Sequence, residues 1–328
     1  MDAVLGHDGP KDQFRRTLLR GRLASTYLFV GPDGVGKRFF AEQLAAALLC
    51  TGDKQGVLTS CGTCDGCRLI AGGTHPDLLR VARPEGKTTL PVDLFIGAAD
   101  KRNREGLCHE IALKPLVAER RVAIIDDADD FSVETANCLL KTLEEPPPGS
   151  LLILIGTSLA RQLPTIRSRS QVVRFRPLAE EQLAQVLMAE PHAMPAGEAT
   201  RLAGEANGSV SQAISLAEGS LDEATALLRG CLDSPRLDGG RLAKILEEES
   251  KAVATEPRIR RRALRDLLGT AIREFHQRLA DKCDDPLNAD RTLEQLEACL
   301  EAEAALGRNA NQSAVVQVLA QRVASAAS

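Results

Sequence analysis

The segment GPDGVGK carries the clearest chemical signal in the chain, because it matches the phosphate-binding pattern G-x-x-x-x-G-K. In such a loop, backbone N–H groups surround phosphate oxygens, and here Gly31, Gly34 and Gly36 would allow the tight path. Lys37 would then contact the terminal phosphates. The next residue usually offers a hydroxyl to Mg²⁺, but Arg38 has no acceptor atom. The sequence therefore predicts a loop that keeps the fold of a nucleotide site but binds weakly, with a ligand-free glycine turn as the alternative.

A second acidic segment, VAIIDDADD, follows a run of apolar residues. In P-loop ATPases the first carboxylate at this point helps to hold Mg²⁺ and the second orients the attacking water. Asp126 and Asp127 take these two positions, although Asp127 is one methylene shorter than the usual glutamate. Asp129 and Asp130 are interpreted as acids that cap the following helix. Thr157, just after another apolar run, is a candidate contact for a γ-phosphate.

Four cysteines lie at the spacing C-x10-C-x2-C-x2-C, at Cys50, Cys61, Cys64 and Cys67. Four thiolates without a catalytic histidine are typical of a closed structural zinc site. Zinc would supply folding free energy to a segment that has almost no apolar core of its own. An iron–sulfur cluster and metal-free buried thiols are the alternatives. His75 is not expected to be a ligand, because the four cysteines already complete the coordination.

The other cysteines fall within helical patterns and are interpreted as small core residues: Cys108, Cys138, Cys231, Cys283 and Cys299. Two arginines, Arg167 and Arg169, stand in the otherwise uncharged segment PTIRSRSQ. From composition alone they would form a solvated or ion-paired surface. The basic run 258–262 is interpreted in the same way, as a solvated helix face rather than a DNA-binding site.

The composition is that of an ordinary globular protein, with 44% hydrophobic and 26% charged residues in a chain of 328. A net charge of -4 gives no global basic field, so any contact with nucleic acid would be local or supplied by a partner. No apolar run approaches the roughly 20 residues of a membrane helix, and the first residues lack the apolar core of a secretion signal. We expect a cytoplasmic protein without a membrane partner.

Five short apolar runs have the length of buried strands, namely residues 27–30, 78–81, 122–125, 151–155 and 172–175. Amphipathic segments such as 39–49 and 132–145 lie between them, so we expect an α/β domain with a parallel sheet covered on both faces. After about residue 177 only helical periodicity remains. The predicted division is 1–177 for the sheet domain with a metal module at about 50–67, 178–219 for a small helical domain, and 220–328 for a larger one.

The order of these motifs resembles the AAA+ subunits of the bacterial DNA polymerase III clamp loader, and most closely the delta-prime family. The resemblance covers roughly residues 1–177 and rests on GPDGVGK, the four-cysteine insert, HPD, LKPLVAERRVAIIDDAD, ETANCLLKTLEEPP and PTIRSRS. It implies a RecA-like AAA+ domain, a helical lid and a helical collar that assembles the complex. The family's Ser-Arg-Cys motif carries an arginine finger, which corresponds to Arg169, although Ser170 replaces the cysteine.

The resemblance implies a subunit of the DNA polymerase III holoenzyme that acts in DNA replication. Its partners would be gamma/tau-type ATPase subunits, a delta-type subunit, the sliding clamp, and primed DNA through the assembled complex. Motor subunits keep a hydroxyl after the P-loop lysine and a glutamate in the acidic motif, so Arg38 and Asp127 favour a partner without its own ATPase activity. One alternative is an active gamma/tau-type ATPase, and another is a zinc-containing interaction module outside replication. Binding of ATP and Mg²⁺ stays open.

Overall fold

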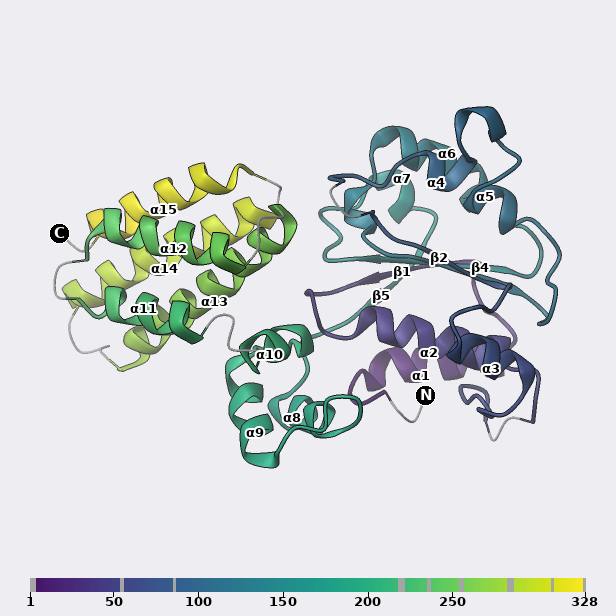
Figure 1. The fold of residues 1–328 in the computed structure, drawn as a ribbon, viewed down its shortest axis with the longest axis horizontal. Coiled ribbons are helices and arrows are strands. Elements are labelled where there is room, and N and C mark those ends of the chain that lie inside the picture. The colour runs from purple at the N-terminus through teal and green to yellow at the C-terminus, as the bar shows by residue number, and fades with distance from the viewer. Residues whose placement is uncertain are drawn as a thin grey trace. The chain divides into compact units, whose positions relative to one another are not determined.

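The computed structural model describes residues 4–53, 56–84, 87–217, 222–234, 237–253, 257–281, 286–307 and 310–326. The chain divides into two compact units, residues 1–211 and 212–328. The first unit contains a parallel sheet with helices on both sides, and the second unit is helical (Figure 1). The predicted α/β fold followed by helices is therefore confirmed.

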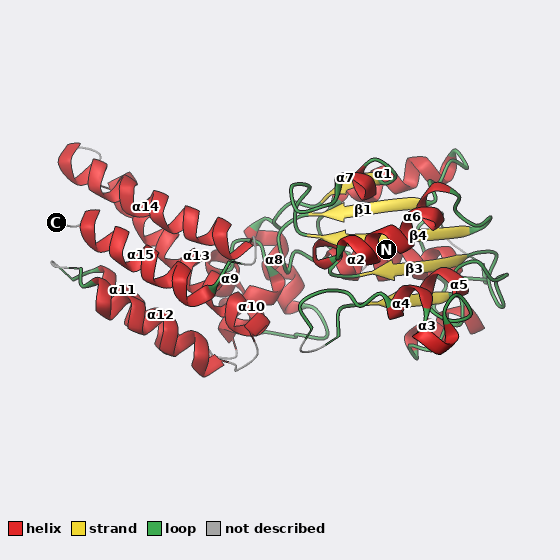
Figure 2. Cartoon of the chain, turned by 90° about the horizontal axis from the view of Figure 1, so that it is seen from above, coloured by secondary structure: helices red, strands yellow, loops and turns green. Residues whose placement is uncertain are grey.

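The sheet of the first unit has five strands in the described residues, in the order β2-β3-β4-β1-β5. All four neighbouring pairs are parallel, so the carboxyl ends of the strands lie along one edge (Figure 2). Each of the five strands predicted from apolar runs is present. Their bounds are β1 (Thr26–Val30), β2 (Leu78–Val81), β3 (Arg121–Ile125), β4 (Ser150–Gly156) and β5 (Gln171–Arg174).

Two apolar cores lie on opposite faces of this sheet, because neighbouring residues of a strand point to opposite sides. Tyr27 and Phe29 of β1 pack into the core that includes Phe14 of α1 (Asp8–Leu19) and Phe40 of α2 (Lys37–Leu49). Leu28 of the same strand packs into the other core. Figure 1 shows α1, α2 and α3 (Asp65–Ala71) on one side of the sheet, and on the other side α4 (Asp93–Ile96), α5 (Leu107–Glu110), α6 (Val133–Glu144) and α7 (Pro164–Arg167).

Helix α6 begins and ends where the sequence predicts. The Ser132 hydroxyl accepts a hydrogen bond from the Thr135 N–H at 3.0 Å, which satisfies one of the N–H groups at the helix start. Ala136, Leu139 and Leu143 are buried against the sheet. The helix therefore presents the apolar stripe that its periodicity indicates.

The remaining helices of the chain follow the sheet domain. Those after β5 are α8 (Glu180–Met188), α9 (Ala196–Glu205) and α10 (Val210–Ala217). The second unit continues with α11 (Asp222–Leu232), α12 (Gly239–Val253), α13 (Pro257–Asp281), α14 (Pro286–Gly307) and α15 (Gln312–Ala326). The border between the two compact units, at residues 211 and 212, differs from the predicted domain boundaries at 177 and 219. The separation into lid and collar therefore stays a prediction.

None of the described helices is long and apolar enough to cross a membrane.

The second unit has its own apolar core, which includes Leu264, Phe275 and Val323. Cys231 and Cys299 are buried in it, as predicted, whereas Cys283 lies outside the described residues. In the basic run 258–262, the side chains of Arg258 and Arg262 also lie outside the described part, and Arg260 is half-buried with its Nε donating to the Ser250 hydroxyl at 3.4 Å.

A fully buried carboxylate joins the start of β2 to the loop before β3. Asp77 accepts hydrogen bonds from the backbone N–H groups of Leu116, Val117 and Ala118 at 2.8–2.9 Å. The buried Arg121 guanidinium lies 3.5 Å from the same carboxylate. Burial alone would raise the pKa of Asp77, but the three N–H donors and Arg121 outweigh it and lower the pKa. The charged form of this side chain therefore holds the loop against the sheet.

We predict that Asp77→Asn lowers the free energy of unfolding by about 3–5 kcal/mol at pH 7, because it leaves the buried Arg121 without its counter-charge. The wild-type contribution is fully present above about pH 4, where the unfolded-state carboxyl is ionised, and is lost as the pH falls through the lowered folded-state pKa. Urea denaturation at several pH values measures both effects.

The matched control is Asp100→Asn, because Asp100 is an exposed carboxylate of the same domain. It should change the stability by less than about 0.5 kcal/mol. Equal stabilities for the two variants would contradict the role assigned to Asp77.

Candidate functional site

The predicted phosphate loop lies between β1 and α2 at the carboxyl edge of the sheet. Gly34 and Gly36 have φ values of +76° and +94°, a region that favours glycine, and Gly36 directly precedes the first turn of α2. The buried Lys37 ammonium donates to the carbonyl oxygens of Gly31 at 2.5 Å and Pro32 at 2.6 Å. The loop has the backbone shape of a phosphate site, but its lysine is hydrogen-bonded to carbonyl oxygens of the same loop.

The residue after the lysine forms an ion pair with the acidic motif. The Arg38 guanidinium lies 3.6 Å from the Asp126 carboxylate, which follows the carboxyl end of β3. It also lies 3.7 Å from Glu42 on the next turn of α2, and Glu42 binds Arg80 of β2 at 3.1 Å. A cation thus stands beside the carboxylate that would otherwise be available to a divalent ion.

The neighbouring Asp127 adopts a left-handed backbone conformation, with φ of +55°. Its carboxylate accepts a hydrogen bond from the backbone N–H of Arg83 at 3.4 Å. The side chain predicted to orient a water molecule is therefore engaged with the segment that follows β2.

The interpretation of Asp129 and Asp130 as helix caps is wrong, because Ser132 caps α6 by itself. Asp129 instead accepts hydrogen bonds from the backbone N–H and the hydroxyl of Thr157, at 2.7 and 2.6 Å, and from the Gln162 side chain. Asp130 pairs with Arg83 at 2.9 Å. Sequence proximity to α6 suggested capping, but the carboxylates bind residues that follow other strands. Thr157 thus lies at the carboxyl edge of the sheet, as expected, and its hydroxyl is hydrogen-bonded to Asp129.

Two segments that the sequence analysis missed contact the phosphate loop. The backbone N–H of Val210 donates to the Gly34 carbonyl at 2.9 Å, and the Ser209 hydroxyl donates to the Asp33 carbonyl at 3.0 Å. A Cβ atom on Gly34 would lie only 2.0 Å from the Ser211 hydroxyl oxygen. The only signal in the sequence is Gly208, whose φ of +73° lets the chain turn directly before these residues.

The second missed contact comes from the N-terminal segment. His7 Nε2 lies 2.7 Å from the Val35 carbonyl oxygen, and the His7 ring packs edge-on against Phe175 with 4.9 Å between ring centres. Burial lowers the pKa of His7, which favours the neutral ring. The phosphate loop is therefore held on both sides by groups of its own domain.

The four predicted metal ligands converge in space. The sulfur atoms of Cys50, Cys61, Cys64 and Cys67 all lie within 4.8 Å of one another. Two of the sulfur–sulfur distances, Cys50 to Cys64 and Cys61 to Cys67, are 3.9 Å. Four sulfurs about 2.3 Å from a tetrahedral ion would be about 3.8 Å apart, so this donor set could hold a zinc ion.

Backbone N–H groups already point at three of these sulfurs. The N–H groups of Cys61, Cys64 and Cys67 donate to the sulfurs of Cys50, Cys61 and Cys64, at 3.3–3.4 Å. Burial opposes ionisation of Cys64, but the Cys67 N–H and hydrogen bonds with Thr51 outweigh it and lower the pKa of Cys64 to about 5. Burial instead raises the pKa of Cys67 to about 12, so these hydrogen bonds favour negative charge on Cys64 rather than on all four sulfurs.

The predicted arginine finger forms an ion pair within its own chain. The Arg169 guanidinium donates to the Glu144 carboxylate at the end of α6, at 2.6 and 3.0 Å, and about one third of the Arg169 side chain is exposed. Its Nη1 also donates to the Thr165 carbonyl and the Ser168 hydroxyl. The composition-based expectation of an ion-paired surface is thus met in the isolated chain.

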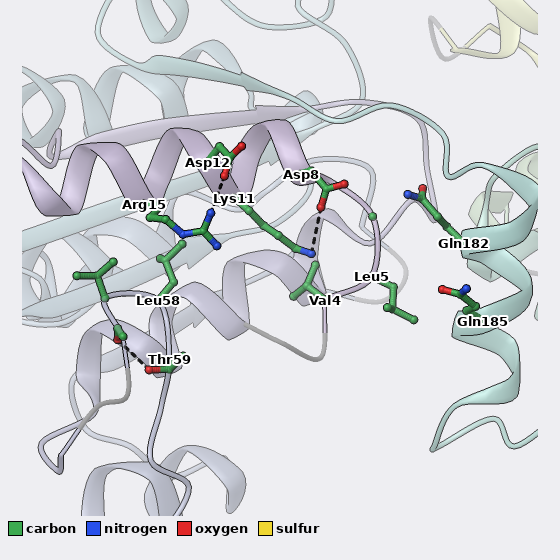
Figure 3. A pocket seen from close by; sticks show the side chains of 13 residues that line it. Val4, Leu5, Asp8, Lys11, Asp12, Arg15, Leu58, Thr59, Gln182 and Gln185 are labelled. Carbon is green, nitrogen blue, oxygen red and sulfur yellow. Dashed lines mark hydrogen bonds and ion pairs between the residues drawn. The ribbon is translucent and has the colours of Figure 1, made fainter.

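A separate cavity of about 480 Å³ lies between α1, residues 56–59 and α8 (Figure 3). Val4, Leu5 and Leu58 form apolar parts of its wall. Its two cations are already neutralised, Lys11 by Asp8 at 3.5 Å and Arg15 by Asp12 at 2.6 Å. None of the predicted nucleotide or metal residues lines this cavity.

Comparison with known proteins agrees with the motif order. The family described as DNA polymerase III, delta subunit, matches residues 6–179. DNA polymerase III subunit delta' of Pseudomonas aeruginosa is 38% identical over 150 residues, which cover 46% of this chain and 42% of the relative. The corresponding subunit of Bacillus subtilis is 31% identical over 201 residues, covering 60% and 55%.

A motor-type relative is also similar: DNA polymerase III subunit tau/gamma of Haemophilus influenzae is 32% identical over 219 residues, covering 65% of this chain and 30% of the relative. Among solved structures, a DNA polymerase III gamma subunit-related protein of Thermotoga maritima is 17% identical with a TM-score of 0.43, covering 97% of this chain and 99% of that one. This chain spans between 30% and 55% of the length of the three curated relatives.

The family match covers more than half of the 328 residues, and it includes the P-loop, the four cysteines, the acidic motif and Arg169. The chain therefore belongs to the DNA polymerase III delta-subunit family, as a clamp-loader subunit of the delta-prime type.

Proposed function

We propose that this chain is a largely non-hydrolysing AAA+ partner in the replicative clamp loader, and that it donates Arg169 to the ATPase site of an adjacent subunit. The observation that carries the first part is the ion pair between Arg38 and Asp126. The proposed partners are gamma/tau-type and delta-type subunits, the sliding clamp, and primed DNA contacted through the assembled complex. The similarity to delta-prime and tau/gamma subunits supports this assembly.

The ion pair bears on catalysis because of where Mg²⁺ binds in P-loop ATPases. There the hydroxyl after the lysine and the first acidic residue of the second motif hold the ion, which bridges the β- and γ-phosphates. Here the first position supplies a guanidinium, and it lies 3.6 Å from the carboxylate of Asp126. A divalent cation at this place would be repelled by Arg38 and would compete with it for Asp126. Loss of both ligands removes the main electrostatic stabilisation of phosphoryl transfer.

The contacts around the phosphate loop also oppose nucleotide entry. Lys37 would have to leave the carbonyls of Gly31 and Pro32 before it could bind phosphate. Loss of these two hydrogen bonds adds to the free-energy cost of binding a nucleotide.

Arg169 is suited to act in another subunit because its present ion pair is weak in energetic terms. The pair with Glu144 is partly exposed on both sides, and such pairs contribute only about 0–1 kcal/mol. A neighbour's γ-phosphate carries more charge than one carboxylate, and arginine binds phosphate oxygens in a bidentate geometry. Exchange of Glu144 for a phosphate is therefore favourable once the neighbour is in place.

We also assign a structural zinc ion to Cys50, Cys61, Cys64 and Cys67. The sulfur spacing and the three N–H···S hydrogen bonds support this assignment. Four sulfur ligands leave no open position for a substrate, so zinc bound there stabilises the segment between α2 and β2 rather than taking part in a reaction.

The isolated chain is expected to hydrolyse ATP in the presence of Mg²⁺ no faster than the buffer background, because the metal ligands are missing. A coupled phosphate-release assay measures this, with the double variant Arg38→Thr, Asp127→Glu as the comparison. Clear turnover that Lys37→Ala abolishes would instead identify an active motor of the gamma/tau type.

In the reconstituted loader, Arg169→Ala should slow hydrolysis at the neighbouring site by about 10³–10⁵-fold, the range known for arginine fingers supplied in trans. Clamp- and DNA-stimulated ATPase activity is the measurement. Arg167→Ala is the matched control, since it removes an arginine two residues away, at the end of α7, and should leave this rate nearly unchanged. Full activity of the Arg169→Ala loader would refute the finger assignment.

Protein purified without chelators should contain one zinc ion per chain by elemental analysis. Cys64→Ser should reduce the zinc content to well below one, because three sulfurs and a hydroxyl bind zinc poorly. Cys138→Ser is the control, as Cys138 lies outside the cluster and should retain the metal. Iron with visible sulfide-to-iron absorbance would favour the iron–sulfur alternative, and a metal-free wild type would contradict both.

A further inference from the structure

His75 has a buried nitrogen atom that nothing in the described part of the chain satisfies. Only 3% of the residue is exposed, and its Nδ1 accepts a hydrogen bond from the backbone N–H of Asp77 at 3.0 Å. An acceptor at Nδ1 means that the neutral ring carries its hydrogen on Nε2. This Nε2 is buried and has no hydrogen-bond partner. A buried N–H donor without an acceptor is rare and calls for an explanation.

The position of this nitrogen relates it to the cysteine cluster. A Cβ atom built on Gly66 would lie 3.6 Å from His75 Nε2, 3.7 Å from the Thr51 hydroxyl and 2.8 Å from the Leu49 carbonyl. Gly66 lies between two of the cysteines in sequence, and residues 49 and 51 flank Cys50. The nitrogen therefore lies close to Gly66, in the turn between Cys64 and Cys67.

From this geometry we propose that His75 is a positioning residue of the metal centre, whose Nε2–H, buried beside Gly66, donates to a sulfur of the four-cysteine cluster when the ion is bound. The inference rests on the zinc assignment made above, but not on the ATPase or finger assignments. His75 does not bind the ion. It disperses charge from a sulfur and orients the turn that holds it, as residues that hydrogen-bond to metal ligands do.

The same residue then links the cluster to the sheet. His75 is joined to Asp77 through Nδ1, and Asp77 holds residues 116–118 through its carboxylate. The His-Pro-Asp segment thus connects the metal module on one side to the loop before β3 on the other. This accounts for a histidine that is buried beside four cysteines without being needed as a ligand.

The test uses the full zinc-loaded chain and two variants with matched shapes. His75→Asn keeps a side-chain acceptor near the place of Nδ1, so the bond from the Asp77 N–H is retained, but it has no donor at the place of Nε2. His75→Gln places an amide donor near Nε2. Transfer of zinc to the chelator 4-(2-pyridylazo)resorcinol gives the affinity, and the cobalt-substituted proteins give the sulfur-to-metal charge-transfer band.

We expect His75→Asn to weaken zinc binding by about 10- to 100-fold and to shift the charge-transfer band, with His75→Gln closer to the wild type in both. Wild-type zinc affinity and an unchanged band in His75→Asn would overturn the inference and leave the zinc assignment intact. Equal losses in both variants with an unchanged band would also overturn it, since they would indicate only a packing role. A wild-type chain without zinc would overturn the inference and the zinc assignment together.

Discussion

The parallel arrangement of the five strands decides where chemistry can occur in this protein. Since the carboxyl ends of parallel strands lie on one edge, the phosphate loop after β1, the acidic motif after β3 and Thr157 after β4 are brought to the same place. The sheet can be buried on both faces because apolar residues of β1 and β3 point to both sides. Helices α1 and α2 cover one face, and α6 covers the other. The frame of an ATPase site is thus preserved as a consequence of burying apolar surface.

What changes within this frame is the distribution of charge. Arg38 and Asp126 neutralise each other, Lys37 binds carbonyls of its own loop, and Asp129 holds Thr157. Every one of these contacts satisfies a polar group that a nucleotide and its metal ion would otherwise satisfy. Contacts of this kind stabilise the loop without a ligand. They are consistent with the non-hydrolysing role proposed above.

A second polar arrangement lies away from that site and has a structural purpose. Asp77 joins β2 to the loop before β3, and its backbone N–H donates to Nδ1 of the buried His75. The segment that carries the cysteines buries few apolar side chains, so the zinc ion proposed above would supply stability that the rest of the domain takes from its core. Buried charge is tolerated here because each carboxylate oxygen of Asp77 has partners.

Local sequence was sufficient for the element types, for the phosphate loop and for the cysteine spacing, because periodicity and short spacings are properties of neighbouring residues. The helix predicted over 132–145, observed as α6, and the convergence of Cys50 with Cys61 followed from such signals. Pairings between distant segments did not follow. Asp129 was interpreted from its neighbours as a cap, yet it binds Thr157, and the contacts of His7 and Ser209 with the phosphate loop were not foreseen. Only the path of the chain through the sheet brings these groups together, and hydrogen bonds act over a few ångströms regardless of separation in sequence.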